Sequence, residues 1–259
     1  MATDATAAGT ISIAGRTVPR MGFGAMRLPG SKDPAAVLRR SVELGVRVID
    51  TAWFYGGGVV NQYIAEALRP YPADLVLATK TGASTTHVGQ GIKPDYSAEQ
   101  LRAGIDRDRS VLGLDTVPLT HLRWMGDGDE VDGVTFDQAF ETMLEIQAEG
   151  RIEHIGLSNV TFDQLRRAHA RGPVASVSNL FGYGAQDDAP TLDFCTENGI
   201  PYLAFGPHGY GVTDTPPLEP GQTAAQARLK WLLARSPVTV VIAGTGSVEH
   251  LEENIAAAG

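Results

Sequence analysis

The sequence has one cysteine, few lysines and no long apolar run. Cys195 is the only cysteine among 259 residues, which excludes an intramolecular disulfide and suits a reducing compartment. No apolar stretch reaches the ~18 residues that a membrane span needs. The opening residues lack the basic and apolar segments of a signal peptide. Together these absences predict a cytoplasmic protein with no membrane contact.

Positive charge is scarce as well. The formal net charge is −9, and the pI is near 5.1. An acidic chain does not attract nucleic acid or an anionic membrane surface, so neither partner is expected. Neither the histidines nor Cys195 show the spacing of a metal site, and no metal is expected. The sequence predicts a globular protein with a small-molecule ligand.

Short β-branched runs alternate with segments of helical period along the whole chain. The predicted strands are 21–26, 47–52, 75–80, 116–124, 154–159, 175–180, 201–206 and 238–245. The predicted helices are 33–45, 60–69, 97–112, 135–149, 161–170, 189–198, 222–235 and 247–257.

Capping residues mark the ends of these helices. A capping box, in which Ser or Thr is followed three residues later by Gln, begins at Ser97, Thr135, Thr161 and Thr223. Glycines that suit the left-handed residue after a helix stand at Gly45, Gly113, Gly150 and Gly199. The predicted helix boundaries therefore have local chemical support.

Eight strand–helix units without a linker predict a single α/β domain over residues 1–259, a closed (β/α)8 TIM barrel with a short N-terminal extension. Within that extension, 10–19, Gly15 favours a turn. A doubly wound open sheet is the alternative, and it usually carries G-x-G-x-x-G after its first strand. The segment 22–27 lacks the third glycine, which favours the barrel.

Polar residues at the carboxyl ends of the predicted strands are where a barrel places its chemistry. Asp50 follows the second strand, Tyr55 lies in the next loop, and Lys80 ends the third strand. An ammonium beside a phenol lowers the phenol's pKa, and a carboxylate holds the ammonium in place. The alternative is an ordinary ion pair and an unrelated tyrosine.

Four motifs then occur in a fixed order: Val48-Ile49-Asp50-Thr51-Ala52-x-x-Tyr55-Gly56, Ala78-Thr79-Lys80, Gly150-Arg151-Ile152-x-x-Ile155-Gly156-Leu157-Ser158-Asn159, and Ile242-x-Gly244-Thr245 followed by Glu249–Asn254. In this combination the chain resembles the aldo-keto reductase superfamily from about Val18 onward. The resemblance implies a (β/α)8 barrel and an NAD(P)H-dependent oxidoreductase. Such an enzyme reduces the aldehyde or ketone carbonyl of a small molecule, with NADPH as cofactor and NADH as the alternative.

The resemblance also implies roles for individual residues. Tyr55 matches the proton donor, Lys80 the lysine that lowers its pKa, and Asp50 the partner that orients the lysine. Ser158 and Asn159 match residues that hydrogen-bond the nicotinamide carboxamide. The remaining cofactor contacts fall on Phe205, Gly244, Thr245, Gly246, Ser247, His250 and Asn254, of which Phe205 is expected to stack on the nicotinamide and Asn254 to face the adenine.

The fourth catalytic position departs from the family pattern. The family pattern is Asp, two residues, Asp, four residues, His. When this pattern begins at Asp115, its histidine position falls on Arg123, and His121 lies two residues earlier. On a regular strand His121 lies about 6–7 Å deeper, in the barrel interior, whereas a bulge favoured by Pro118 would raise it. Arg123 either extends to solvent or acts beside Tyr55, where a permanent cation polarises a carbonyl and favours an anionic substrate.

Two further departures concern the cofactor. Ser178 stands where the family commonly has a glutamine against the nicotinamide, and its shorter hydroxyl needs a water to make that contact. The loop from Gly244 to His250 carries neither Lys nor Arg. Charge in this loop therefore does not support selectivity for the 2′-phosphate, and NADPH is expected from the family alone.

Aromatic residues beside the predicted site are expected to line a substrate pocket, with plain packing as the alternative. They are Trp53, Phe54 and Trp124. His208 and Tyr210, after the seventh strand, either line the pocket or lie exposed. Family members usually have a longer loop there and a segment after the last helix, so an unusually open site is expected.

Two other functions remain open. The changes at Arg123 and Ser178 both touch hydride chemistry, so a lyase, cyclase or isomerase with Tyr55, Lys80 and Arg123 as acid–base groups is an alternative. In that case the nucleotide is absent or structural. The third function is a nucleotide-sensing binding subunit without catalysis. Neither the substrate nor the oligomeric state follows from the sequence.

Overall fold

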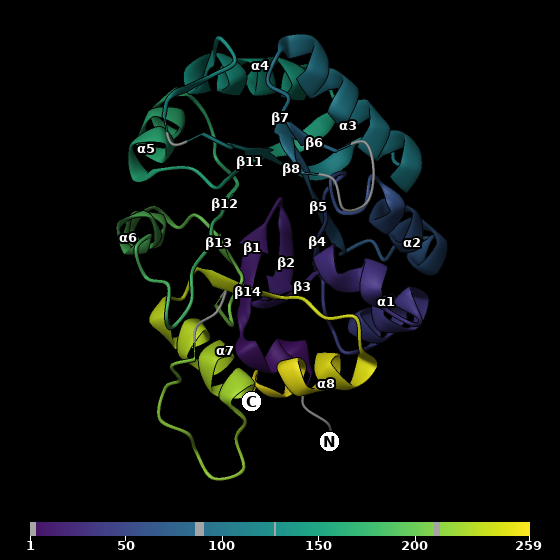
Figure 1. The fold of residues 1–259 in the computed structure, drawn as a ribbon, viewed down its shortest axis with the longest axis vertical. Coiled ribbons are helices and arrows are strands. Elements are labelled where there is room, and N and C mark those ends of the chain that lie inside the picture. The colour runs from purple at the N-terminus through teal and green to yellow at the C-terminus, as the bar shows by residue number, and fades with distance from the viewer. Residues whose placement is uncertain (1–3, 86–90, 127, 210–212) are drawn as a thin grey trace.

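The computed structural model describes residues 4–85, 91–126, 128–209 and 213–259. Its centre is a closed barrel of eight parallel strands that follow one another in chain order around the ring (Figure 1). The strands are β3 (Met21–Gly24), β4 (Val48–Asp50), β5 (Val76–Thr81), β8 (Val117–Arg123), β11 (Ile152–Ser158), β12 (Ser176–Ser178), β13 (Tyr202–Phe205) and β14 (Thr239–Ala243). The predicted (β/α)8 barrel is confirmed, and the doubly wound alternative is wrong.

Among the described residues, eight α-helices surround the barrel (Figure 1). They are α1 (Pro34–Glu43), α2 (Val59–Leu68), α3 (Ala98–Leu112), α4 (Phe136–Ala148), α5 (Phe162–Arg171), α6 (Ala189–Asn198), α7 (Ala224–Arg235) and α8 (Val248–Ala256). All four predicted capping boxes are formed, with both reciprocal hydrogen bonds. Every predicted strand and helix coincides with its observed counterpart to within two residues.

The N-terminal extension forms a hairpin, β1 (Thr10–Ile13) with β2 (Arg16–Pro19). Ala14 and Gly15 connect the two strands, and both have positive φ, as a tight two-residue hairpin turn requires. The hairpin packs Ile13 and Val18 against residues of the barrel interior such as Val48. Because Val48 begins its strand, the hairpin closes the amino end of the barrel and leaves the carboxyl end for the site.

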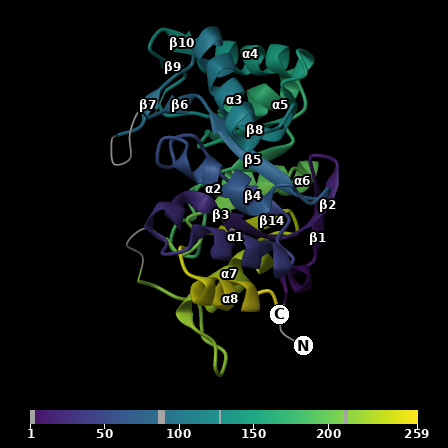
Figure 2. The same cartoon turned by 90° about the vertical axis from the view of Figure 1, so that its right-hand side faces the viewer.

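The connecting segments contain short strands and helices. Two-stranded pairs form between β6 (Ala83–Ser84) and β7 (Lys93–Pro94) and between β9 (Glu130–Val131) and β10 (Val134–Thr135), and the short helices are η1 (Ala5–Ala8) and η2 (Ala25–Gly30). Figure 2 shows β6 and β7 on the side of the molecule opposite the β1–β2 hairpin. These two pairs therefore belong to the carboxyl-end loops.

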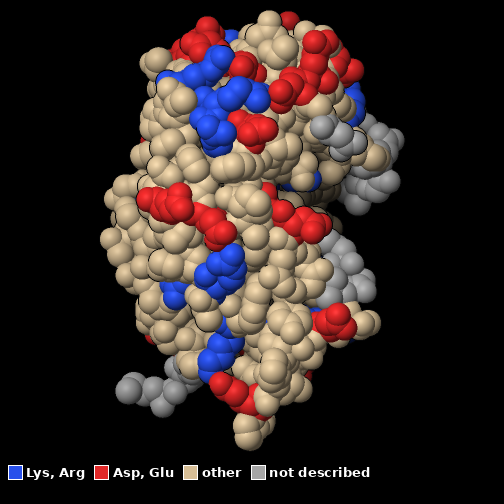
Figure 3. Space-filling model, turned by 90° about the vertical axis from the view of Figure 1, so that its left-hand side faces the viewer, with Lys and Arg blue, Asp and Glu red and all other residues tan. Residues whose placement is uncertain are grey.

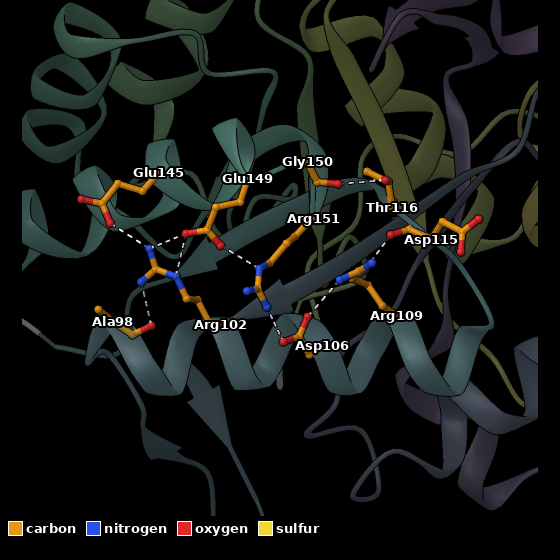
Figure 4. Close-up of polar contacts among 10 residues, drawn as sticks. All are labelled: Ala98, Arg102, Asp106, Arg109, Asp115, Thr116, Glu145, Glu149, Gly150 and Arg151. Carbon is orange, nitrogen blue, oxygen red and sulfur yellow. Dashed lines mark hydrogen bonds and ion pairs between the residues drawn. The ribbon is translucent and has the colours of Figure 1, made fainter.

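A network of ion pairs joins α3 to the end of α4 and the start of β11 (Figure 4). Arg102 binds Glu145 and Glu149 at 2.8 and 2.6 Å, and Arg151 links Glu149 to Asp106. Single exposed pairs contribute little stability, but a shared network fixes the packing of neighbouring elements. Acidic and basic side chains are likewise interleaved on the face in Figure 3.

Candidate active site

A cavity of about 430 Å³ opens at the carboxyl end of the barrel. It is lined by ends of strands and by the loops that follow them. Eight of the predicted site residues lie on its wall: Asp50, Phe54, Tyr55, Lys80, Arg123, Phe205, His208 and Gly244. The structure therefore gathers residues that are far apart in the sequence around one space.

Asp50, Tyr55 and Lys80 are in direct contact, so the alternative of an unrelated tyrosine is wrong. Lys80 Nζ donates to both Asp50 carboxylate oxygens, at 2.6 and 2.7 Å, and to Tyr55 Oη at 3.1 Å. Tyr55 Oη lies 3.3 Å from Asp50 Oδ1. Asp50 and Lys80 are 2% and 3% exposed. Asp50 and Lys80 are thus buried, Tyr55 is half-buried, and all three groups reach the cavity wall.

The charge of Lys80 is set by two opposing effects. Burial lowers the pKa of Lys80, and the neighbouring Asp50 carboxylate acts in the opposite direction by hydrogen bonding and charge. Arg123 also lowers it through repulsion. The net effect lowers the pKa of Lys80, while the Asp50 carboxylate favours the charged form, an ammonium beside the phenol oxygen.

A buried polar chain continues behind this unit and was not predicted. Lys80 Nζ donates to the carbonyl of Thr51 at 3.1 Å, Thr51 Oγ1 donates to Asn61 Oδ1 at 2.7 Å, and Asn61 Nδ2 donates to Asp108 Oδ1 at 2.7 Å. Burial raises the pKa of Asp108 to about 7. Asp108 lies on the buried face of α3, where helical periodicity predicts apolar residues. A charged residue at such a position is the feature of the sequence that could have revealed this polar chain.

His121 does not reach the cavity: of the two positions left open for it, the structure shows the barrel interior, so His121 is not a catalytic residue of this cavity. Strand β8 pairs without a bulge to β5 and β11, so the irregular strand suggested by Pro118 is absent. His121 is fully buried in the barrel interior, and its Nε2 lies 2.9 Å from Ser176 Oγ. Burial lowers the pKa of His121 to about 3. Gly156 leaves room for this ring, because a Cβ there would lie 2.3 Å from His121 Cδ2.

Arg123 occupies the cavity wall in place of a histidine. It is the last residue of β8, and its Nη1 donates to Ser158 Oγ at 3.3 Å. Its guanidinium carbon lies 5.7 Å from the ring centres of both Phe54 and Phe205. The side chain is therefore part of the site rather than a charge that extends to bulk solvent.

Two of the predicted pocket walls are wrong. Trp124 is fully buried in the core, where it stacks on Tyr96 with ring centres 4.4 Å apart and its Nε1 donates to the Gly128 carbonyl. Trp53 lies under the Arg107 guanidinium, outside the cavity lining. Phe54 and His208 do line the cavity. Tyr210 falls outside the described residues.

Three of the residues expected at the nicotinamide, Ser158, Asn159 and Ser178, line neither cavity. Asn159 adopts a left-handed conformation, with φ of 57°, and its Nδ2 donates to the Trp124 carbonyl at 2.8 Å. Ser158 is buried and accepts the hydrogen bond from Arg123. Ser178 Oγ is buried without a hydrogen-bond partner among the described residues. An orphaned hydroxyl of this kind is suited to a ligand or a bridging water.

A second cavity, more open to solvent, lies at the amino end of α8. Thr245, Gly246, Ser247 and His250 line it, as expected for a phosphate-binding loop. Ser247 caps the helix by accepting a hydrogen bond from the His250 amide. Asn254 lines neither cavity; it is 6% exposed and lies beside His208. The predicted loop residues share one surface, and Asn254 does not.

Two cations beside this loop were missed. The loop itself carries neither Lys nor Arg, but Arg27 and Lys32, from the segment after β3, line the same second cavity. Arg27 also lines the first cavity. These two residues could have been predicted, because they follow the first barrel strand, and every loop after a strand lies at the carboxyl end of the barrel. Charge is therefore available to an anionic ligand after all.

Two kinds of feature are absent from the part of the chain that the structure describes. Among these residues there is no group of three or more His, Cys, Asp or Glu side chains placed to hold a metal ion. Within the same ranges no helix is long and apolar enough to cross a membrane.

Comparison with known proteins agrees with this geometry. Residues 20–216 match the model of the aldo/keto reductase family. The chain is 37% identical to a pyridoxine 4-dehydrogenase of Escherichia coli, covering 96% of this chain and 92% of that protein. It is 35% identical to an uncharacterized oxidoreductase of Schizosaccharomyces pombe, covering 100% and 87%.

Solved structures share the fold at lower identity. An aldo-keto reductase of Klebsiella pneumoniae in complex with NADPH has a TM-score of 0.75 at 22% identity, covering 100% of this chain and 90% of that one. A putative aldo-keto reductase from Pseudomonas has a TM-score of 0.82 at 22% identity, covering 100% and 97%. With the family model and two relatives above 30% identity, the chain belongs to the aldo/keto reductase family and is an oxidoreductase of that type.

Proposed function

We propose that this protein is an NADPH-dependent oxidoreductase that reduces the aldehyde or ketone carbonyl of a small molecule. One observation carries the proposal. At the wall of the cavity, the phenol oxygen of Tyr55 lies 3.1 Å from an ammonium that is itself bound by a buried carboxylate. This arrangement suits a proton donor rather than a structural tyrosine.

The roles of the three residues follow from their contacts. Tyr55 donates its proton to the carbonyl oxygen of the substrate and becomes a phenolate. Lys80 stabilises that phenolate by its charge, and Asp50 fixes Lys80 through two hydrogen bonds. NADPH, when bound, supplies the hydride that adds to the carbonyl carbon. The product is an alcohol, and Tyr55 regains its proton from water.

The residues present fit a nicotinamide dinucleotide. A Cβ on Gly244 would lie 2.7 Å from the Gly24 carbonyl oxygen, so glycine is needed for the close approach of β3 and the end of β14, and both glycines line the cavity without a side chain. Phe205 supplies an aromatic ring on the same cavity wall. The second cavity adds the amino end of α8, which favours phosphate.

The preference for NADPH over NADH rests on the second cavity. Arg27 and Lys32 supply two positive charges beside Thr245 and Ser247, whose hydroxyls are also available. Only the adenosine 2′-phosphate distinguishes the two cofactors, and cations recognise that group directly. Asp33, the N-cap of α1, lines the same cavity. Its single negative charge is smaller than the two positive charges of Arg27 and Lys32, so the cavity keeps a net positive charge.

The substrate to test first comes from the relative in Escherichia coli, which is named for the oxidation of pyridoxine at position 4. We propose pyridoxine and its 4-aldehyde as candidate substrates of this chain. The identity of 37% over nearly the whole chain supports the choice. Simple aliphatic and aromatic aldehydes and ketones complete the panel.

The test measures binding and turnover separately. Purified protein is titrated with NADPH and NADH by fluorescence quenching, and the carbonyl panel is then added while the absorbance of the reduced nicotinamide is followed. Binding together with substrate-dependent oxidation supports the proposal. Binding without oxidation across the panel contradicts reduction and favours a non-redox or sensing function. No binding of either nucleotide contradicts the nucleotide-dependent functions altogether.

A further inference from the structure

We propose that Arg123 binds an anionic oxygen of the substrate, so that the preferred substrates are carbonyl compounds that carry a carboxylate or another oxyanion close to the carbonyl carbon. This inference rests on the proposed carbonyl reductase activity and adds to it the chemical class of the substrate. It is drawn from the surroundings of Arg123 in the cavity.

The Arg123 guanidinium has no carboxylate partner among the described residues. No ion pair joins it to Asp or Glu, and its Nη1 makes one long hydrogen bond, 3.3 Å, to the neutral hydroxyl of Ser158. Its Nε is buried without a hydrogen-bond partner there. Guanidinium groups elsewhere, such as those of Arg102 and Arg151, are each paired with carboxylates (Figure 4). A buried donor left without an acceptor is costly, and a ligand oxyanion removes that cost.

Two aromatic rings flank the same guanidinium. Phe54 and Phe205 each lie 5.7 Å from its central carbon, on the wall of the cavity. Aromatic rings at this distance stabilise a cation and exclude water from around it. They accept no hydrogen bond in the plane of the guanidinium. The N–H groups of Arg123 therefore stay available for the paired oxygens of an oxyanion.

The charge balance of the cavity points the same way. Asp50 is the only acidic residue in the described lining, and Lys80 neutralises it at 2.6 Å. The cavity therefore keeps the positive charges of Arg123 and Arg27, although the whole chain has a net charge of −9. Arg27 also borders the second cavity, at the proposed phosphate site. Arg123 is thus the cation left for the substrate.

Two matched pairs of substrates test the inference with NADPH at saturation. The anions are phenylglyoxylate and 2-carboxybenzaldehyde, and each is compared with its neutral methyl ester, which keeps the carbonyl and the ring. The wild-type protein is expected to show a kcat/KM about 10- to 100-fold higher for the anion in at least one pair, the size expected of a charge-assisted contact.

Variants assign that preference to one residue. Arg123→Gln is expected to abolish the preference by raising KM at least about tenfold more for the anion than for the ester. Arg123→Lys keeps the charge but not the paired donors, and is expected to restore part of the preference. Arg16→Gln is the matched control, because Arg16 pairs with Glu153 on the outer surface and lines neither cavity. It should leave the preference unchanged.

The outcomes separate this inference from the proposed function. If the esters and other neutral carbonyls are reduced without any preference for the anions, the role of Arg123 is wrong and carbonyl reduction stands. An equal loss of activity toward anion and ester in Arg123→Gln also overturns it, since that pattern indicates a general catalytic role. If no carbonyl compound oxidises NADPH, the proposed function itself fails.

Discussion

Asp108 is a buried carboxyl group whose ionisation lowers the stability of the folded protein. Its pKa is raised by burial to about 7, from an ordinary value of 3.8. Between these two values the folded chain holds a proton that the unfolded chain releases, so the free energy of unfolding falls as the pH rises from about 4 to about 7. The full shift corresponds to about 4 kcal/mol.

Replacing Asp108 by Asn removes this dependence. Asparagine keeps an acceptor oxygen for the Asn61 amide at 2.7 Å but carries no proton that titrates. The difference in the free energy of unfolding, variant minus wild type, is therefore expected to increase by about 3 kcal/mol between pH 5 and pH 8. The gain builds up between pH 5 and about 7, where the wild-type carboxyl group is protonated in the folded chain and ionised in the unfolded chain, and it levels off above pH 7.

Urea denaturation at several pH values from 5 to 8 measures this difference, and all other titrating groups cancel between the two proteins. Asp106→Asn is the control, because Asp106 lies on the same helix, is 45% exposed and pairs with Arg109 and Arg151. Its difference from wild type should stay below about 1 kcal/mol at every pH. A difference for Asp108→Asn that does not change with pH would refute the assignment of a raised pKa.

Two further predictions concern the cofactor and the barrel interior. Lys32→Ala is expected to weaken NADPH binding about three- to tenfold and to leave NADH binding unchanged; equal changes for both nucleotides in a fluorescence titration would contradict a 2′-phosphate contact. Gly156→Ala introduces a Cβ 2.3 Å from His121 Cδ2. It should destabilise the protein by about 1–3 kcal/mol and lower Tm by several degrees, and an unchanged Tm would show that the interior accommodates the methyl group.

The architecture could be predicted from the sequence because each unit carries its own local signals. Strands buried on both faces appear as continuous apolar runs, and the boxes at Ser97 and Thr161 mark helix starts chemically. The group of Asp50, Tyr55 and Lys80 was predictable because strand ends converge at one end of a barrel. None of these inferences requires knowledge of how distant side chains pack.

The residues that were misplaced, left open or missed depend on such packing. Trp124 follows β8 but turns into a core with Tyr96, and no local pattern distinguishes that direction from a pocket wall. His121 stays deep because Gly156, on the neighbouring strand, gives its ring a space. Lys32 reaches the α8 loop across more than two hundred residues of sequence. In each case the deciding contact is between segments whose proximity the sequence does not express.

The most direct test of the account is a single-turnover measurement on Tyr55→Phe. NADPH is bound to the wild-type and variant proteins, their dissociation constants are compared, and oxidation is followed after a carbonyl substrate is added. The account predicts unchanged NADPH binding and a rate of oxidation lower by about 10²- to 10⁴-fold, the usual contribution of a positioned proton donor. A variant that binds NADPH and oxidises it at the wild-type rate would show that Tyr55 is not the proton donor.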